Sequence, residues 1–156
     1  METMEKRWQD ACAEQVHIIR PEHINGSGRL FGGQLLMWID VVAGVAARRF
    51  ANSDVTTACI DHLQFLAPAR AGDLLVTVGR VTWTGRTSIE VRVDSFVEKM
   101  DGRREMVNRA YLVEVALDEN EKPRPVPKLI LETEEDKIEW NAAEKRRIAR
   151  MNAKKC

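Results

Sequence analysis

The sequence lacks the features that mark several large classes of protein. It has three cysteines, Cys12, Cys59 and Cys156, an odd number with no metal-like spacing, so neither a disulfide framework nor a metal site is expected. Lys plus Arg and Asp plus Glu each number 24, so the basic excess typical of nucleic-acid-binding proteins is missing. No apolar run approaches the roughly 20 residues that span a bilayer, and the charged start is no signal or transit peptide. These absences favour a protein of the reducing cytoplasm with no nucleic-acid or membrane partner.

The composition is that of an ordinary folded domain. Hydrophobic residues make up 44% and charged residues 31% of 156 residues, which is enough chain to bury one core. Pro123, Pro125 and Pro127 interrupt the pattern near the end. We therefore expect a domain over residues 8–130, followed by a charged helical tail over residues 131–156.

A long apolar segment occupies residues 34–50 and predicts the central element of the fold. Its apolar side chains recur at helical spacing and also occupy other faces. The residues on the main face are Leu35, Leu36, Ile39, Val42, Ala43, Ala46 and Phe50. A helix that is apolar on nearly all sides is normally buried, so other elements should wrap around it.

Segments of strand character surround this helix in the sequence. They cover residues 13–20, 55–65, 74–83, 87–98 and 105–117, and are rich in Val, Ile, Thr and aromatic residues. In the fourth segment, one face carries Ile89, Val91, Val93, Ser95 and Val97, and the other carries Glu90, Arg92, Asp94, Phe96 and Glu98. Short turns such as Thr84-Gly85 and Asp101-Gly102 favour antiparallel pairing. We predict an α+β fold in which an antiparallel sheet curls around one long helix.

The tail predicts a second helix over residues 133–152. Thr133 is a suitable N-cap, acidic residues fill the first turn, and basic residues lie near the end, as suits the helix dipole. The apolar face is thin, so the helix is expected to be partly exposed or docked on a neighbouring subunit.

Asp40 requires an explanation because it lies within the apolar helix. Burying an ionised carboxylate without partners costs several kcal/mol. One interpretation places Asp40 on a wet face or among backbone donors, where its role is structural. The other makes it a catalytic carboxylate.

Gly33 shares a helix face with Asp40 and lies about 10 Å from it along the axis, at 1.5 Å per residue. A glycine pair at a helix start leaves backbone N–H groups open to an anion. The two sites are too far apart to act on one carbonyl carbon, but two antiparallel helices related by a twofold axis would bring them together. Asn25 adds a side-chain amide that either donates to a substrate or belongs to a plain Asn-Gly turn.

The run NGSGRLFGGQ at residues 25–34, with Asp40 seven residues after Gly33, resembles the hotdog-fold acyl-CoA thioesterases. The most similar group is the single-domain bacterial acyl-CoA hydrolases, and the cytosolic long-chain acyl-CoA hydrolases are double-domain relatives. Residues 57–65, 68, 72–73 and 85–89 also match, so the resemblance covers about residues 10–130. Ser27 and Arg29 depart from the family, many of whose members carry Asn and an acidic residue there, which leaves substrate fit open.

The resemblance implies hydrolysis of acyl-CoA to a free carboxylic acid and CoA. Asp40 would be the general base or nucleophile, Asn25 of the opposing subunit would position the carbonyl or the water, and the Gly33 N–H would stabilise the oxyanion. No metal or separate cofactor is implied, since CoA is part of the substrate and product. The expected assembly is a homo-oligomer of hotdog dimers, either a hexamer or a tetramer. The implied CoA-binding residues are Phe31, Gly32, Arg86, Thr87 and Ser88.

Two other functions stay open. A hotdog dehydratase or hydratase would need a histidine near the helix start, but Phe31-Gly32-Gly33 has none beside it. A non-catalytic acyl-CoA sensor would keep the pocket and would not need Asp40. The basic end of the tail, residues 145–155, is either solvated or in contact with CoA phosphates.

Overall fold

A five-stranded antiparallel sheet with the order β2-β4-β5-β6-β3 forms the centre of the molecule. The structure, a computed structural model, describes residues 4–154. The strands are β2 (Ala13–Ile18), β3 (Asp54–Phe65), β4 (Leu74–Thr84), β5 (Ser88–Glu98) and β6 (Arg104–Leu117). These bounds differ from those expected by one or two residues, and the α+β class and antiparallel pairing are confirmed.

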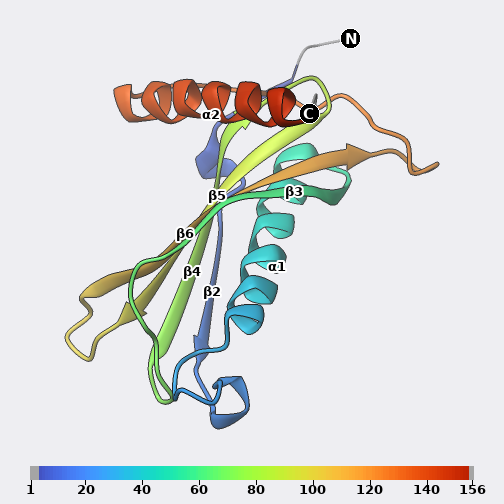
Figure 1. Ribbon diagram of the computed structural model, residues 1–156. Helices are drawn as coiled ribbons and strands as arrows, with labels where there is room; N and C mark the ends of the chain where they lie inside the picture. The colour runs from blue at the N-terminus through green and yellow to red at the C-terminus, as the bar shows by residue number, and fades with distance from the viewer. Residues whose placement is uncertain (1–3, 155–156) are drawn as a thin grey trace.

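Helix α1 (Gly32–Ala51) lies along one face of this sheet, with its buried side chains against all five strands (Figure 1). Gly79 of β4 allows the close approach, because a Cβ there would lie 3.0 Å from Val42 Cγ1 and 3.4 Å from its carbonyl oxygen. The far side of the helix stays uncovered in the single chain: Met37 is 55% and Val41 is 48% exposed. The expected long helix is confirmed, and the sheet covers one side of it.

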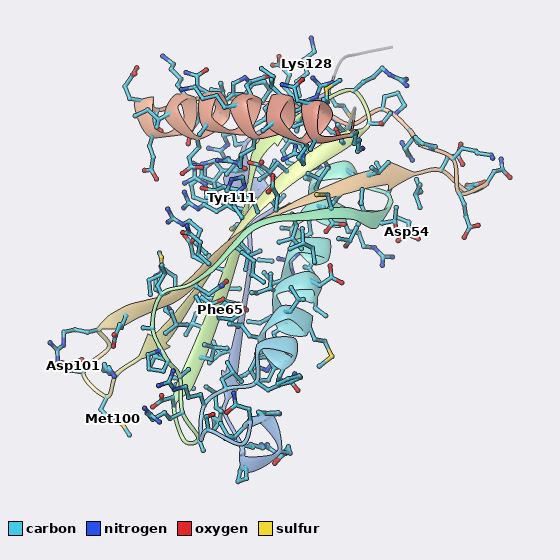
Figure 2. The ribbon with its side chains drawn as sticks, viewed as in Figure 1. Asp54, Phe65, Met100, Asp101, Tyr111 and Lys128 are labelled. Carbon is cyan, nitrogen blue, oxygen red and sulfur yellow. The ribbon has the colours of Figure 1, made fainter. Side chains whose placement is uncertain are left out.

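Strand β3 forms one edge of the sheet. It pairs with β6 and with no other strand among residues 4–154, so one side of a twelve-residue strand keeps unpaired N–H and C=O groups. Asp54 and Phe65 mark its two ends in Figure 2. Such a long free edge is a ready template for pairing with another strand.

Helix α2 (Glu134–Ala153) crosses one end of the sheet, on the face away from α1 (Figure 1). Thr133 caps it as expected, because its Oγ1 accepts a hydrogen bond from the Asp136 N–H at 3.1 Å. Two short strands, β1 (Glu5–Lys6) and β7 (Lys128–Leu129), pair in parallel, and two 3-10 turns are η1 (Trp8–Asp10) and η2 (Pro21–His23). No helix among residues 4–154 is long and apolar enough to cross a membrane.

Ion pairs hold α2 on the sheet. Arg146 Nη2 lies 2.8 Å from Glu90 Oε1, and its guanidinium stacks 3.6 Å from the ring centroid of Tyr111, which is labelled below α2 in Figure 2. Three further pairs are Arg80–Asp136, Arg92–Glu139 and Arg150–Asp61. The tail therefore docks on its own sheet. At the basic end, Lys145, Arg147 and Lys154 are exposed, in line with the solvated interpretation, whereas Arg146 and Arg150 pair with carboxylates of the sheet. Lys155 and Cys156 lie outside the described residues.

Candidate active site

The start of α1 offers backbone donors that the fold leaves open. The N–H groups of Gln34 and Leu35 donate to the Phe31 carbonyl, whereas the Gly33 N–H has no acceptor among residues 4–154. Glycine at position 33 leaves room for the Phe31 ring, because a Cβ there would lie 2.5 Å from its Cε1 and would displace the ring. The open N–H and the positive end of the helix dipole make this a place for a negatively charged oxygen.

Asn25 sits in a tight loop just before this helix. Its side-chain Oδ1 accepts hydrogen bonds from the N–H groups of Ser27 at 2.9 Å and Arg29 at 3.2 Å. Its side-chain NH2 has no partner within the described part of the chain. Both sequence interpretations of Asn25 are thus compatible, since the oxygen shapes the turn and the amide hydrogens stay available to a ligand.

A pocket of about 420 Å³ connects this loop to the start of α1 and the end of β3. Phe65, at the end of β3 in Figure 2, lies close enough that a Cβ on Gly32 would touch its ring at 3.5 Å. Phe65 is 59% exposed, so the pocket has an apolar and accessible wall. The lining residues are Asn25, Arg29, Leu30, Gly32, Phe65, Leu66, Ala67 and Pro68.

Asp40 lies half-buried on α1 and is held from β3. Thr57 Oγ1 lies 2.7 Å from Asp40 Oδ1 and also 3.0 Å from Oε1 and 3.1 Å from Oε2 of Glu114. Glu114 belongs to β6 and is the register partner of Thr57. One hydroxyl therefore lies between two carboxyl groups.

Glu114 was not among the residues singled out from the sequence, although a signal was present. Along β6, alternate positions 110, 112, 114 and 116 point to the buried face, and Glu114 stands among Ala and Leu there. The pKa of Glu114 is raised to about 7: burial raises it most, the nearby negative charge of Asp40 adds to this, and a hydrogen bond from Thr57 to the ionised carboxylate acts in the opposite direction.

The expected CoA-binding segment lies at the other end of the sheet. Ser88 pairs with Val115 of β6, close to the residue of β6 that pairs with Asp54 at the start of β3. Phe65, at the pocket end of β3, pairs with Asn108 near the opposite end of β6. The carbonyls of Arg86 and Thr87 accept backbone hydrogen bonds. Within one chain, residues 86–88 are therefore not brought to the pocket, while Phe31 and Gly32 are beside it.

The histidines have packing and ion-pair partners. His17 stacks on Trp38 with ring centroids 4.2 Å apart, and burial lowers its pKa. His23, the histidine closest in sequence to the start of α1, packs edge-on against the same ring, and His62 lies 2.7 Å from Asp61. Among residues 4–154, no group of three or more His, Cys, Asp or Glu residues is arranged to hold a metal ion.

Comparisons with known proteins identify the family. The model of the thioesterase superfamily matches residues 27–102. The uncharacterized acyl-CoA thioester hydrolase YkhA of Bacillus subtilis is 37% identical over 157 residues, covering 99% of this chain and 91% of that protein. Related mouse thioesterases are longer, and the chain spans 24% to 37% of their length.

Solved structures show the same fold over nearly the whole chain. An apo-hexameric acyl-CoA thioesterase superposes with a TM-score of 0.91 at 36% identity, covering 96% of this chain and 97% of that one. The acyl-CoA hydrolase of Staphylococcus aureus, solved with butyryl-CoA and CoA, gives a TM-score of 0.89 at 29% identity, covering 97% and 95%. It has also been solved with an aspartate, an asparagine or a threonine replaced by alanine. The hotdog fold is thereby confirmed, and this chain belongs to the acyl-CoA thioester hydrolases of the thioesterase superfamily.

Proposed function

We propose that this protein hydrolyses acyl-CoA thioesters to CoA and a free carboxylic acid, in a site built from two copies of the chain. The observation that carries the proposal is the position of Asp40. Its carboxylate is fixed by Thr57 at 2.7 Å at the border between the sheet-facing and the exposed sides of α1, beside the free edge of β3. Membership of the acyl-CoA thioester hydrolases supports the reaction class.

The free edge of β3 supports a twofold assembly. If β3 pairs antiparallel with its own copy, the Phe65 end of one strand lies beside the Thr57 half of the other. The Asn25 loop and the Gly33 N–H of one copy then face Asp40 of its partner. The exposed Met37 and Val41 side chains would be covered by the same contact. We propose a homo-oligomer of such dimers, and the hexameric relative favours a hexamer over a tetramer.

The proposed reaction uses these groups in a simple division of roles. Asp40 accepts a proton from water as the water oxygen bonds to the thioester carbonyl carbon, and the C–S bond then breaks to release CoA, whose sulfur recovers the proton. The Gly33 N–H stabilises the negative carbonyl oxygen, and the Asn25 amide donates to the carbonyl or the water. A route in which Asp40 attacks the carbonyl directly and forms an anhydride uses the same atoms.

The variants made in the S. aureus hydrolase support this choice of residues. The replaced asparagine, aspartate and threonine stand at the same spacing along the chain as Asn25, Asp40 and Thr57. We propose that Phe31 and Gly32 bind CoA beside the pocket, and that Arg86, Thr87 and Ser88 reach it from a neighbouring copy. CoA is then bound as substrate and product, with no further cofactor. Residues 8–130 would carry the catalytic domain and residues 131–156 the tail, in a protein of the cytoplasm.

The first experiment measures free-thiol release from acetyl- to palmitoyl-CoA by the wild type, Asp40→Asn and Asn25→Ala. We expect kcat to fall at least about a hundredfold in both variants, the scale of losing a proton acceptor or a positioning donor. Asp10→Asn is the matched control, because Asp10 is exposed and pairs with Arg7 far along the chain from the site. A wild type that binds acyl-CoA without releasing thiol would replace this proposal with the sensor function.

Mixing the two inactive variants tests the shared site. A heterodimer of Asp40→Asn with Asn25→Ala contains one intact site, with both working residues supplied by different chains. Random reassortment should therefore restore about a quarter of the wild-type activity, since half the dimers are mixed and each has one intact site. If Asn25 and Asp40 act within one chain, the mixture stays as inactive as its components.

A dehydratase remains the second candidate by fold, but the histidines argue against it. His23 packs on Trp38, and its Nδ1 accepts a hydrogen bond from the Arg20 N–H. A histidine so engaged is poorly placed to move a proton next to the carbonyl. Release of water from a 3-hydroxyacyl-CoA without thiol release would favour the dehydratase.

A further inference from the structure

Glu114 is a buried carboxyl group for which the proposed hydrolysis gives no role. It is 1% exposed, and both of its oxygens lie within hydrogen-bond distance of Thr57 Oγ1. No Lys, Arg or His pairs with it among residues 4–154. A buried, ionised carboxylate without a cation is costly, so the fold must satisfy this group in another way.

The count of hydrogens around Thr57 shows how. A threonine hydroxyl has one hydrogen to donate and two lone pairs to accept with. Asp40 Oδ1, at 2.7 Å, is closer to the hydroxyl than either oxygen of Glu114, at 3.0 and 3.1 Å, which favours Asp40 as the acceptor of the one hydroxyl hydrogen. The remaining contact, between Thr57 Oγ1 and Glu114 at 3.0 Å, is a hydrogen bond only if Glu114 supplies the hydrogen.

We propose that Glu114 is a positioning residue that stays protonated and donates to Thr57 Oγ1, which in turn donates to Asp40. The inference rests on the proposed function, because it assigns Glu114 to the orientation of the reacting carboxylate. The hydrogen bond from Thr57 to Asp40 Oδ1 restricts rotation of the carboxylate and leaves Asp40 Oδ2 available for the proton of the attacking water.

The surroundings of Glu114 favour its neutral form. Asp40 on α1 is the charged group that acts on it within the described residues. Burial, and then this charge, raise the pKa of Glu114 to about 7, even with the lowering that a Thr57 hydrogen bond to the ionised carboxylate would bring; a Glu114 that donates to Thr57 does not have that lowering. The β5 register places Ile89 opposite Glu114, while the adjacent Glu90 is paired with Arg146 of α2. Loss of the Glu114 proton would leave one Thr57 hydrogen between two carboxylates, and Asp40 would lose part of its support.

Glu114→Gln tests this arrangement because the amide keeps the shape and donates a hydrogen that it cannot lose. We expect its kcat at pH 6 to stay within about threefold of the wild type, with an unchanged KM, since Glu114 does not touch the substrate. Between pH 6 and 8.5, the ratio of variant to wild-type kcat should rise at least about threefold, as the wild-type Glu114 ionises. Glu105→Gln is the control, an exposed change on the same strand.

Two outcomes would overturn the inference. If the kcat of Glu114→Gln at pH 6 fell as far as that of Asp40→Asn, the carboxylate of Glu114 itself would be needed. If the ratio of variant to wild-type kcat stayed constant from pH 6 to 8.5, the Glu114 proton would have no influence. A measurement that does not depend on catalytic activity distinguishes failure of this inference from failure of the proposed function. Carbon-13 labelling of glutamate should show one side-chain carboxyl signal titrating near neutral pH and absent from Glu114→Gln; if every signal titrates as an ordinary glutamate does, the inference fails even in an active hydrolase.

Discussion

Replacing Glu114 by glutamine is also expected to change how stability depends on pH. Below pH 4.5, the ordinary pKa of the group, Glu114 is protonated in both the folded and the unfolded chain. Between pH 4.5 and about 7 the unfolded chain releases this proton and the folded chain keeps it, so the free energy of unfolding falls as the pH rises. Above about pH 7 both forms are ionised and the loss is complete.

The size of the effect follows from the shift. A rise from 4.5 to about 7, at about 1.36 kcal/mol for each pKa unit, corresponds to about 3 kcal/mol. Glutamine has no proton to lose. The free energy of unfolding of Glu114→Gln should therefore rise by about 3 kcal/mol relative to that of the wild type between pH 4.5 and pH 8. The gain is measured as the change with pH of the difference between the two proteins, which removes any constant effect of the substitution.

Urea unfolding at several pH values gives this difference directly. The protomer concentration must be the same throughout, because an oligomer is stabilised by its own concentration. Glu105→Gln, on the exposed part of β6, should follow the wild type. A difference in the free energy of unfolding between Glu114→Gln and wild type that stays constant from pH 4.5 to 8 would contradict this expectation, since it would mean that folding does not alter the titration of Glu114.

Two further substitutions test the anchoring of α2 and the start of α1. Arg146→Met removes the cation that pairs with Glu90, a side chain that is 0% exposed, and should lower the free energy of unfolding by about 3–5 kcal/mol. Arg147→Met, a change at the exposed neighbouring residue, is the control and should have little effect in the same urea titration. Gly33→Ala should reduce kcat at least about tenfold, because the added methyl group would displace the Phe31 ring and crowd the approach to the open N–H of the same residue. Gly26→Ala, where a Cβ meets no atom within 4 Å, is the control in the thiol-release assay.

The strands and α1 were predictable because each is determined by local pattern. Most strand bounds were predicted to within one or two residues. The signals were the alternation in residues 87–98, the helical spacing in residues 34–50 and the turn glycines. The docking of α2 was not predictable in the same way. Its thin apolar face predicted a helix that is partly exposed or docked on a neighbouring subunit, whereas charged pairs such as Arg92 and Glu139 hold it on its own sheet.

The candidate site was partly predictable. Asp40, Gly33 and Asn25 stand within sixteen residues of one another, and their chemistry follows from residue type and helix geometry. Thr57 and Glu114 come from strands distant in sequence, so their contact with Asp40 depends on the β3–β6 register, which no local pattern specifies. Residues 86–88 lie at the other end of the sheet, and a single chain has no means of bringing them to the pocket.

The charged contact between α2 and the sheet has a consequence for a chain that loses its tail. A helix that docks through apolar packing alone cannot be lost without exposing a large apolar patch. Here α2 covers the charged side chains of Arg80, Glu90 and Arg92, which water would solvate if the helix were absent, together with Trp83, which packs on Trp140. Removal of the tail would therefore expose one aromatic side chain among charged ones, and we expect the remaining domain to aggregate less than a domain stripped of an apolar helix would.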